Sequence, residues 1–329
     1  MYDNLIHFYI PGLNADYIGF YLYMNEYMRK FPERFMPNIK ISSYYGSFNN
    51  TIWNGGRYVH GIQLNKSKIE KIIQDINKEG IAVRYTYTNN QIEEKHLSDT
   101  YCNLTMDLAD NGKNEVLVNS PILEKYLRKQ YPNFKYILST TACERNINNI
   151  NSAAEKYDLV VLDYRDNHNI SFLNQIENKE KIEILLDEVC PSNCRFRKQH
   201  YSNISKINIY NSNSTESRCL NNDSCGKQLN FYENLLVNND TNLTVDELYG
   251  RYFDMGFRHF KLIGRNIGNP LFAFESYIYY LTKKETRDYV RYDLLEWYMD
   301  YVCNELKENA SSRIEWRENK LNETQNNGI

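Results

Sequence analysis

The chain alternates between short apolar runs and longer segments whose apolar residues recur every three or four positions. Short runs bounded by turn residues predict buried strands, and the longer spacing predicts amphipathic helices. We expect strands at Leu5–Ile10, Ile39–Tyr45, Ile81–Tyr87, Glu115–Val118, Lys135–Leu138, Leu159–Leu162, Ile182–Leu186 and Phe260–Ile263. We expect helices at Tyr17–Lys30, Lys66–Lys78, Leu97–Leu108, Ile122–Tyr131, Ile147–Lys156, Ile170–Ile176, from Thr244 to Gly256, and at Phe272–Leu281 and Val290–Leu306.

Regular strand–helix alternation is typical of a parallel sheet in the α/β class. Eight such units predict a closed (β/α)8 TIM-type barrel, with an open doubly wound sheet as the alternative. We expect residues 1–286 to form the barrel domain, with a cysteine-bearing insertion at 187–257 between strands seven and eight. A C-terminal helix at 287–308 would follow, and the polar residues 309–329 predict a flexible tail.

Composition and charge narrow the function classes. Of the 329 residues, 42% are hydrophobic and 25% are charged, as in soluble globular proteins. A net charge of −3 gives no global positive field for nucleic acid. The sequence has no basic leader before an apolar run and no stretch of eighteen apolar residues, so we expect a cytoplasmic protein without a membrane partner.

Four of the seven cysteines lie in one region. Cys190 and Cys194 form a C-x3-C pair, and Cys219 and Cys225 form a C-x5-C pair. Such clustering predicts a shared metal centre. We favour a four-iron four-sulfur cluster over zinc, because zinc sites prefer shorter paired spacings. Cys143 is an alternative fourth ligand.

The other two cysteines lie within helical patterns. For Cys102 and Cys303 the sequence therefore predicts a role as small buried hydrophobic residues.

In a barrel of this type, the residues that follow each strand converge at one face, where catalysis takes place. Here they are Tyr45, Asn119, Cys143, Glu144, Asp163, Arg165, Asp187, Glu188, Cys190 and Arg265. We predict catalytic roles for Asp163, Glu188 and Arg165, and substrate binding by Tyr45, Asn119 and Arg265. An internal Asp163–Arg165 ion pair is equally compatible with the sequence. The scattered histidines give no sign of a hydrolytic triad.

Two short motifs carry a family resemblance. The segment Phe257-Arg-His-Phe-Lys-Leu-Ile-Gly-Arg265, after Met255-Gly256, resembles a glycine–arginine strand of the collagenase-like peptidase U family, and Cys190-Pro-Ser-Asn-Cys194-Arg195 resembles its cysteine segment. The resemblance implies a barrel whose four cysteines hold a four-iron four-sulfur cluster, and it adds Lys261 to the substrate-binding residues. Several members of that family act in oxygen-independent hydroxylation of quinone precursors or RNA bases.

The leading hypothesis is therefore an iron–sulfur-dependent barrel enzyme of hydroxylase type, acting on a small molecule or nucleobase with a redox partner protein. An alternative is a metal-stabilised binding or accessory protein whose partner performs the chemistry. Peptide hydrolysis is a third hypothesis.

Overall fold

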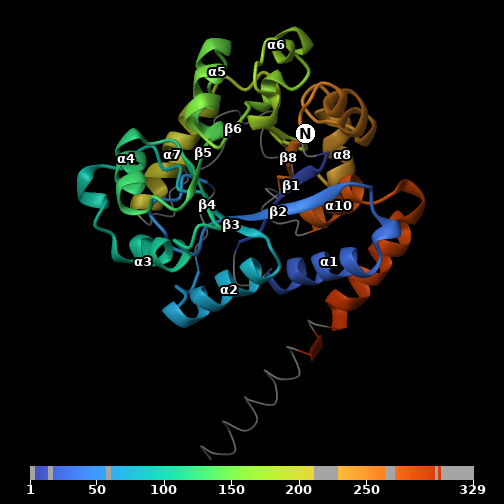
Figure 1. Ribbon diagram of the computed structural model, residues 1–329, viewed down its shortest axis with the longest axis horizontal. Coiled ribbons are helices and arrows are strands. Elements are labelled where there is room, and N and C mark those ends of the chain that lie inside the picture. The colour runs from blue at the N-terminus through green and yellow to red at the C-terminus, as the bar shows by residue number, and fades with distance from the viewer. Residues whose placement is uncertain are drawn as a thin grey trace, which may run out of the picture.

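The strands form a closed barrel in chain order, β1-β2-β3-β4-β5-β6-β7-β8, and every neighbouring pair is parallel. The computed structural model describes residues 4–13, 18–56, 61–210, 229–263, 271–300 and 303–304. Helices surround the ring of strands (Figure 1). The predicted α/β class and (β/α)8 barrel are confirmed.

The bounds of the predicted elements lie within a few residues of those observed, whereas the helices at Arg197–Tyr210 and Phe231–Val237 were not predicted. The strands are β1 (Ile6–Pro11), β2 (Ile39–Gly46), β3 (Ala82–Tyr85), β4 (Glu115–Val118), β5 (Lys135–Leu138), β6 (Leu159–Val161), β7 (Ile182–Leu185) and β8 (His259–Lys261). The barrel helices are α1 (Ile18–Lys30), α2 (Lys66–Lys78), α3 (Thr100–Ala109), α4 (Pro121–Gln130), α5 (Ile147–Lys156), α6 (Ile170–Asn174) and α10 (Leu271–Leu281). Between β7 and β8 lie α7 (Arg197–Tyr210), α8 (Phe231–Val237) and α9 (Val245–Glu247), and α9 continues as a π-helical turn over Leu248–Tyr252.

Local sequence explains where these helices begin. The side chain of Asn65 accepts a hydrogen bond from the Lys68 backbone N–H at the start of α2. Ser120 caps α4 in the same way, and Pro121 occupies the first helical turn. These caps satisfy backbone donors that have no partner inside the helix, and proline is tolerated at that position. Each cap fixes the helix start directly after a loop or strand.

The barrel interior combines an apolar cluster with a layer of buried charge. The cluster consists of Tyr9, Tyr45, Leu117, Ile137, Leu159, Val161, Tyr164, Leu185 and Ile263. Within the layer, Arg84 Nε lies 2.6 Å from Glu115 Oε2, and its Nη1 lies 2.5 Å from Glu183 Oε2. Its guanidinium carbon is 3.7 Å from the centre of the Tyr9 ring. Buried charges of this kind require oppositely charged partners, and each of these two carboxylates is paired with the Arg84 guanidinium.

Helix α7 is tied to loops on several sides of the barrel's carboxyl-terminal mouth. At its end, Asn208 Nδ2 donates to the carbonyls of Asn54 and Gly56, which follow β2. In its middle, the Ser205 carbonyl accepts a hydrogen bond from Asn89, which follows β3. Its first residue, Arg197, contacts residues that follow β5, β6 and β7. The inserted helix therefore connects opposite sides of this mouth.

The C-terminal part is helical over residues 287–300. Tyr23 on α1 stacks on Trp297 with ring centroids 4.0 Å apart. Cys303 is exposed, so its predicted burial is wrong, whereas Cys102 is fully buried as predicted. The predicted tail at 309–329 lies outside the described residues. Among the described helices, none combines the length and the apolar character needed to cross a bilayer.

Candidate functional site

Arg197 lies at the centre of a buried polar cluster at the carboxyl-terminal mouth. The side chain is 3% exposed. Its Nε is 3.5 Å from Asp163 Oδ2, its Nη1 is 3.5 Å from Glu188 Oε2, and its Nη2 donates to Thr140 Oγ1 at 3.0 Å. The guanidinium also lies 4.4 Å from the centre of the Tyr164 ring. One arginine therefore joins the ends of β5, β6 and β7.

Asp163 is held as an ionised carboxylate. Arg165 donates to both of its oxygens, from Nε at 2.8 Å and from Nη2 at 2.7 Å. Burial acts to raise the pKa of Asp163, but the hydrogen bonds from Arg165 and the charges of Arg197 and Arg165 bring it below its ordinary value. The internal ion pair allowed by the sequence is present, and a second arginine extends it.

The turn that carries Cys190 and Cys194 is fastened to the end of β6. Within the turn, the Cys194 N–H donates to the Pro191 carbonyl at 3.1 Å. Tyr164 donates its hydroxyl to the same carbonyl at 2.9 Å, and Arg165 Nη1 donates to the Cys194 carbonyl at 3.3 Å. Both thiols lie close enough to Tyr164 to act on its pKa, which burial raises first. The two cysteines are thus held at the rim of the polar cluster.

Cys143 approaches the same cluster from the end of β5. It closes the turn Thr140–Ala142 with a left-handed backbone, φ 54°, which is uncommon for a residue other than glycine. Burial raises the pKa of its thiol, and a hydrogen bond and the positive charge from Arg197 oppose that rise. Three of the described cysteines therefore surround the Arg197 cluster.

Asp187 joins the end of β7 to β8 and α10. Its carboxylate accepts hydrogen bonds from the Ile263 backbone N–H at 2.7 Å and from Ser276 Oγ at 2.5 Å. Complete burial raises the pKa of Asp187 to about 7, although both hydrogen bonds oppose the rise. The group positions the exit of β8, which leads to the predicted Arg265.

The structure brings together only part of the predicted site. Asp163, Arg165, Glu188 and the Cys190–Cys194 turn form one cluster, as described above. Tyr45 and Lys261 lie inside the barrel: Lys261 Nζ is 3.8 Å from the centre of the Tyr45 ring and 3.7 Å from Glu183 Oε1. Asn119 follows β4, and no hydrogen bond among the described residues joins it to the Arg197 cluster. Arg265, Cys219 and Cys225 lie outside the described residues.

Sequence reasoning missed the arginine that organises the cluster. Arg197 follows the C-x3-C pair by three residues and begins α7, so a basic residue next to the cysteines was the available signal. Tyr164 and Thr140 were also missed. Both follow barrel strands, but an uncharged tyrosine or threonine at a strand end gives no specific chemical signal in the sequence.

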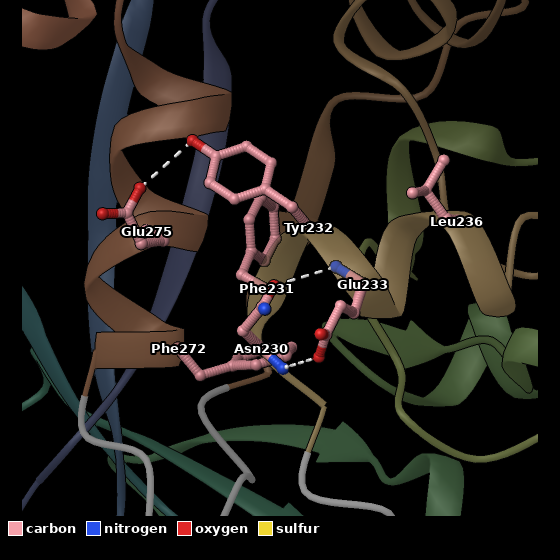
Figure 2. A pocket seen from close by; sticks show the side chains of 7 residues that line it. All are labelled: Asn230, Phe231, Tyr232, Glu233, Leu236, Phe272 and Glu275. Atoms are coloured by element: carbon pink, nitrogen blue, oxygen red, sulfur yellow. Dashed lines mark hydrogen bonds between the residues drawn. The ribbon is translucent and has the colours of Figure 1, made fainter.

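A separate hollow of about 410 Å³ lies beside α8 and α10 (Figure 2). Tyr232 reaches from α8 to α10 and donates to Glu275 Oε2 at 3.1 Å, while Leu236 lies farther along α8. Phe231 packs edge-on against Phe272, with ring centroids 5.5 Å apart. These contacts attach the inserted α8 to the barrel, and they include none of the predicted site residues.

Comparison with known proteins yields a structural likeness. No protein-family model matches the sequence, and no curated protein matches it. A solved structure described as the U32 peptidase Mk0906 is similar over 81% of this chain and 94% of its own, with 13% identity and a TM-score of 0.48. A likeness at this level assigns no activity to the chain.

Proposed function

We propose that the chain is an enzyme with a four-iron four-sulfur cluster at the carboxyl-terminal mouth of its barrel, ligated by Cys190, Cys194, Cys219 and Cys225. It would catalyse an oxygen-independent modification, of hydroxylase type, on a small molecule or nucleobase. The observation that carries the proposal is the anchored turn, which holds two cysteines beside a buried group of arginines and carboxylates.

The described residues fit such a group in two respects. The hydrogen bonds that fix the turn go to the Pro191 and Cys194 carbonyls, so the turn is positioned without using its sulfur atoms for those bonds. Arg165 and Arg197 place positive charge at the same rim, which favours thiolate ligands and a negatively charged cluster. The remaining ligands, Cys219 and Cys225, would come from the segment between α7 and α8.

The residues around the turn suggest how a substrate would be bound. Asp163 is ionised and has both oxygens occupied by Arg165, so we assign it the orientation of the two arginines rather than proton donation. The guanidiniums would then hold a carbonyl or anionic substrate group, and Glu188 would accept a hydrogen bond from a substrate O–H or N–H. A bound cluster would supply electron transfer, and because hydroxylation oxidises the substrate, a redox partner protein would accept the electrons.

Anaerobic purification followed by iron, acid-labile sulfide and zinc analysis tests the proposal. We expect roughly four iron and four sulfide per chain in the parent protein, in line with cluster stoichiometry. Cys190→Ser and Cys194→Ser should each lose the iron, and the exposed Cys303→Ser is the matched control that should retain it. Protein with neither iron nor zinc would contradict the proposal.

The same measurements separate the alternatives. Bound zinc without sulfide would favour the accessory-protein hypothesis, in which the metal orders the inserted segment and a partner performs the chemistry. Cleavage of a peptide by metal-free protein would instead favour a peptidase. Cleavage that survives in both cysteine variants would place that activity away from the turn.

A further inference from the structure

The amino-terminal mouth of the barrel contains a cavity of about 570 Å³. It lies at the opposite end from the Arg197 cluster, among residues at the starts of strands and in the loops that precede them, such as His7, Ala82 and Leu159. Small-molecule sites typically have volumes in this range. In barrels of this type the amino-terminal face usually serves stability, so an open cavity there requires an explanation.

Small residues leave this cavity open. Ala82 is the first residue of β3, and its methyl group is the only side chain that this position contributes to the wall. Gly80 and Gly112 turn the chain with φ of 71° and 77°, and a Cβ added at either would have no neighbouring atom within 4 Å. The loops before β3 and β4 therefore leave the entrance unfilled.

Two imidazoles form part of the wall. The rings of His7 and His259 stack with centroids 4.8 Å apart and planes inclined by 22°. His7 Nδ1 lies 2.8 Å from Ser42 Oγ, and His259 Nδ1 lies 2.5 Å from the Tyr9 hydroxyl. These hydrogen bonds fix both rings in place.

Two apolar side chains form another part of the cavity wall. Ile137 on β5 and Leu159 on β6 line the same cavity as the paired imidazoles, and both belong to the apolar cluster of the barrel interior. The cavity therefore combines flat ring surfaces with aliphatic ones, a lining suited to a planar organic group.

The rim carries three exposed lysines, Lys40, Lys113 and Lys135. Within the described part of the chain, none of them has an ion-pair partner. The acidic residues of the lining are partly engaged: Glu115 is bound by Arg84, and the Asp158 carboxylate accepts the Tyr136 backbone N–H at 2.8 Å.

Glu180 is the remaining acidic residue of the lining. Because Arg84 neutralises Glu115, the three lysines outnumber the two other carboxylates, Asp158 and Glu180. The entrance therefore attracts anions.

We propose that this mouth binds a small organic oxyanion, carrying a phosphate or carboxylate group on a flat body. The three lysines bind the oxyanion, and the body enters between the paired imidazoles and the side chains of Ile137 and Leu159. This assignment concerns the end of the barrel away from the cysteines and is independent of the proposed function.

Thermal unfolding at constant ionic strength tests the proposal with three ligands: phenyl phosphate, benzoate and inorganic phosphate. Ligand that binds only the folded state raises the melting temperature in a saturable way. We expect phenyl phosphate or benzoate to do so, and phenyl phosphate to bind about tenfold more tightly than inorganic phosphate because its ring is buried. Tighter binding of phenyl phosphate would identify the anionic group as a phosphate, and tighter binding of benzoate would identify it as a carboxylate.

Two variants and one control locate the binding site. Lys135→Glu reverses a rim charge and should weaken binding at least tenfold, whereas Lys125→Glu, on the exposed face of α4, should leave it unchanged. Ala82→Leu should fill the cavity and also abolish binding. If Ala82→Leu does not fold, Lys135→Glu decides. Absence of saturable stabilisation by any ligand, or stabilisation that persists in Lys135→Glu, would overturn the proposal.

Discussion

The guanidinium of Arg197, at the start of the inserted helix α7, forms an ion pair with Asp163 at the end of β6, with Nε 3.5 Å from Oδ2. Both side chains are buried, and Glu188 lies at the same distance from another guanidinium nitrogen. Two carboxylates that follow neighbouring strands thus share a cation supplied by the insertion. The insertion is therefore part of the structure of the mouth.

Replacing Arg197 by Met should lower the free energy of unfolding by about 3–5 kcal/mol, because the buried Glu188 loses its ion pair with Arg197 and the buried Asp163 loses the second of its two arginines. Arg195→Met is the matched control, since Arg195 is exposed and lies two residues away. That control should change stability by less than about 0.5 kcal/mol. Urea unfolding of both variants measures the difference, and equal losses would show that Arg197 does not stabilise these carboxylates.

The contribution of Asp187 to the free energy of unfolding should fall as the pH rises. Its pKa is about 7 in the folded state and near 3.9 when unfolded, so the folded state retains a proton that the unfolded state has lost. This contribution falls by about 2–3 kcal/mol between pH 5 and pH 8. Asp187→Asn should remove that part of the pH dependence in urea unfolding. An unchanged pH profile in the variant would contradict this assignment.

His259 should produce the opposite trend at acid pH. Burial, the neighbouring His7 and the charge of Arg84 lower the pKa of His259 to about 3, whereas the unfolded value is near 6.5. The stability contribution is therefore present above pH 6.5 and is lost as the pH falls towards 3, by about 2 kcal/mol at pH 5. Thermal unfolding of His259→Asn should lack this loss. His200→Asn, on α7, should retain it.

The buried Arg84–Glu183 pair should behave as a coupled unit. Arg84→Met removes the guanidinium that Glu115 and Glu183 share and leaves Glu183 with only the more distant Lys261, so it should destabilise the protein by about 3–5 kcal/mol. Adding Glu183→Gln removes one of those charges, so the double variant should be more stable than the sum of the two single effects implies. A double-mutant cycle by urea unfolding measures this coupling, and strict additivity would rule it out.

Sequence patterning was sufficient for the architecture because each element has a strong local signal. The bounds of Lys66–Lys78 and Glu115–Val118 match those predicted, since a cap, a helical repeat and a short apolar run are local properties. The strand-end rule also selected Asp163 and Glu188, and both of these residues contact Arg197. These successes depend on short-range pattern and on the symmetry of the barrel.

Ion pairs between residues far apart in the chain could not be predicted from local sequence patterns. Arg197 meets Asp163 only because α7 returns to the barrel mouth, and no local pattern encodes that path. Likewise, Arg84 and Glu183 alternate with apolar residues in their strands, a pattern shared with strands that face solvent on one side. Only closure of the barrel shows that these charges face inward.

The charged layer inside the barrel also determines which strand alignments are available during folding. Shifting β3 by one residue against β4 would move Arg84 to the outer, apolar face and take its guanidinium away from the buried Glu115 and Glu183. Apart from their glutamates, the strands Glu115–Val118 and Ile182–Leu185 consist of aliphatic residues of similar shape. Without the charged layer, a shift of either strand against its neighbour would therefore cost less free energy. A misaligned barrel would carry unpaired buried charges, so the charged layer selects the native alignment over its closest competitors.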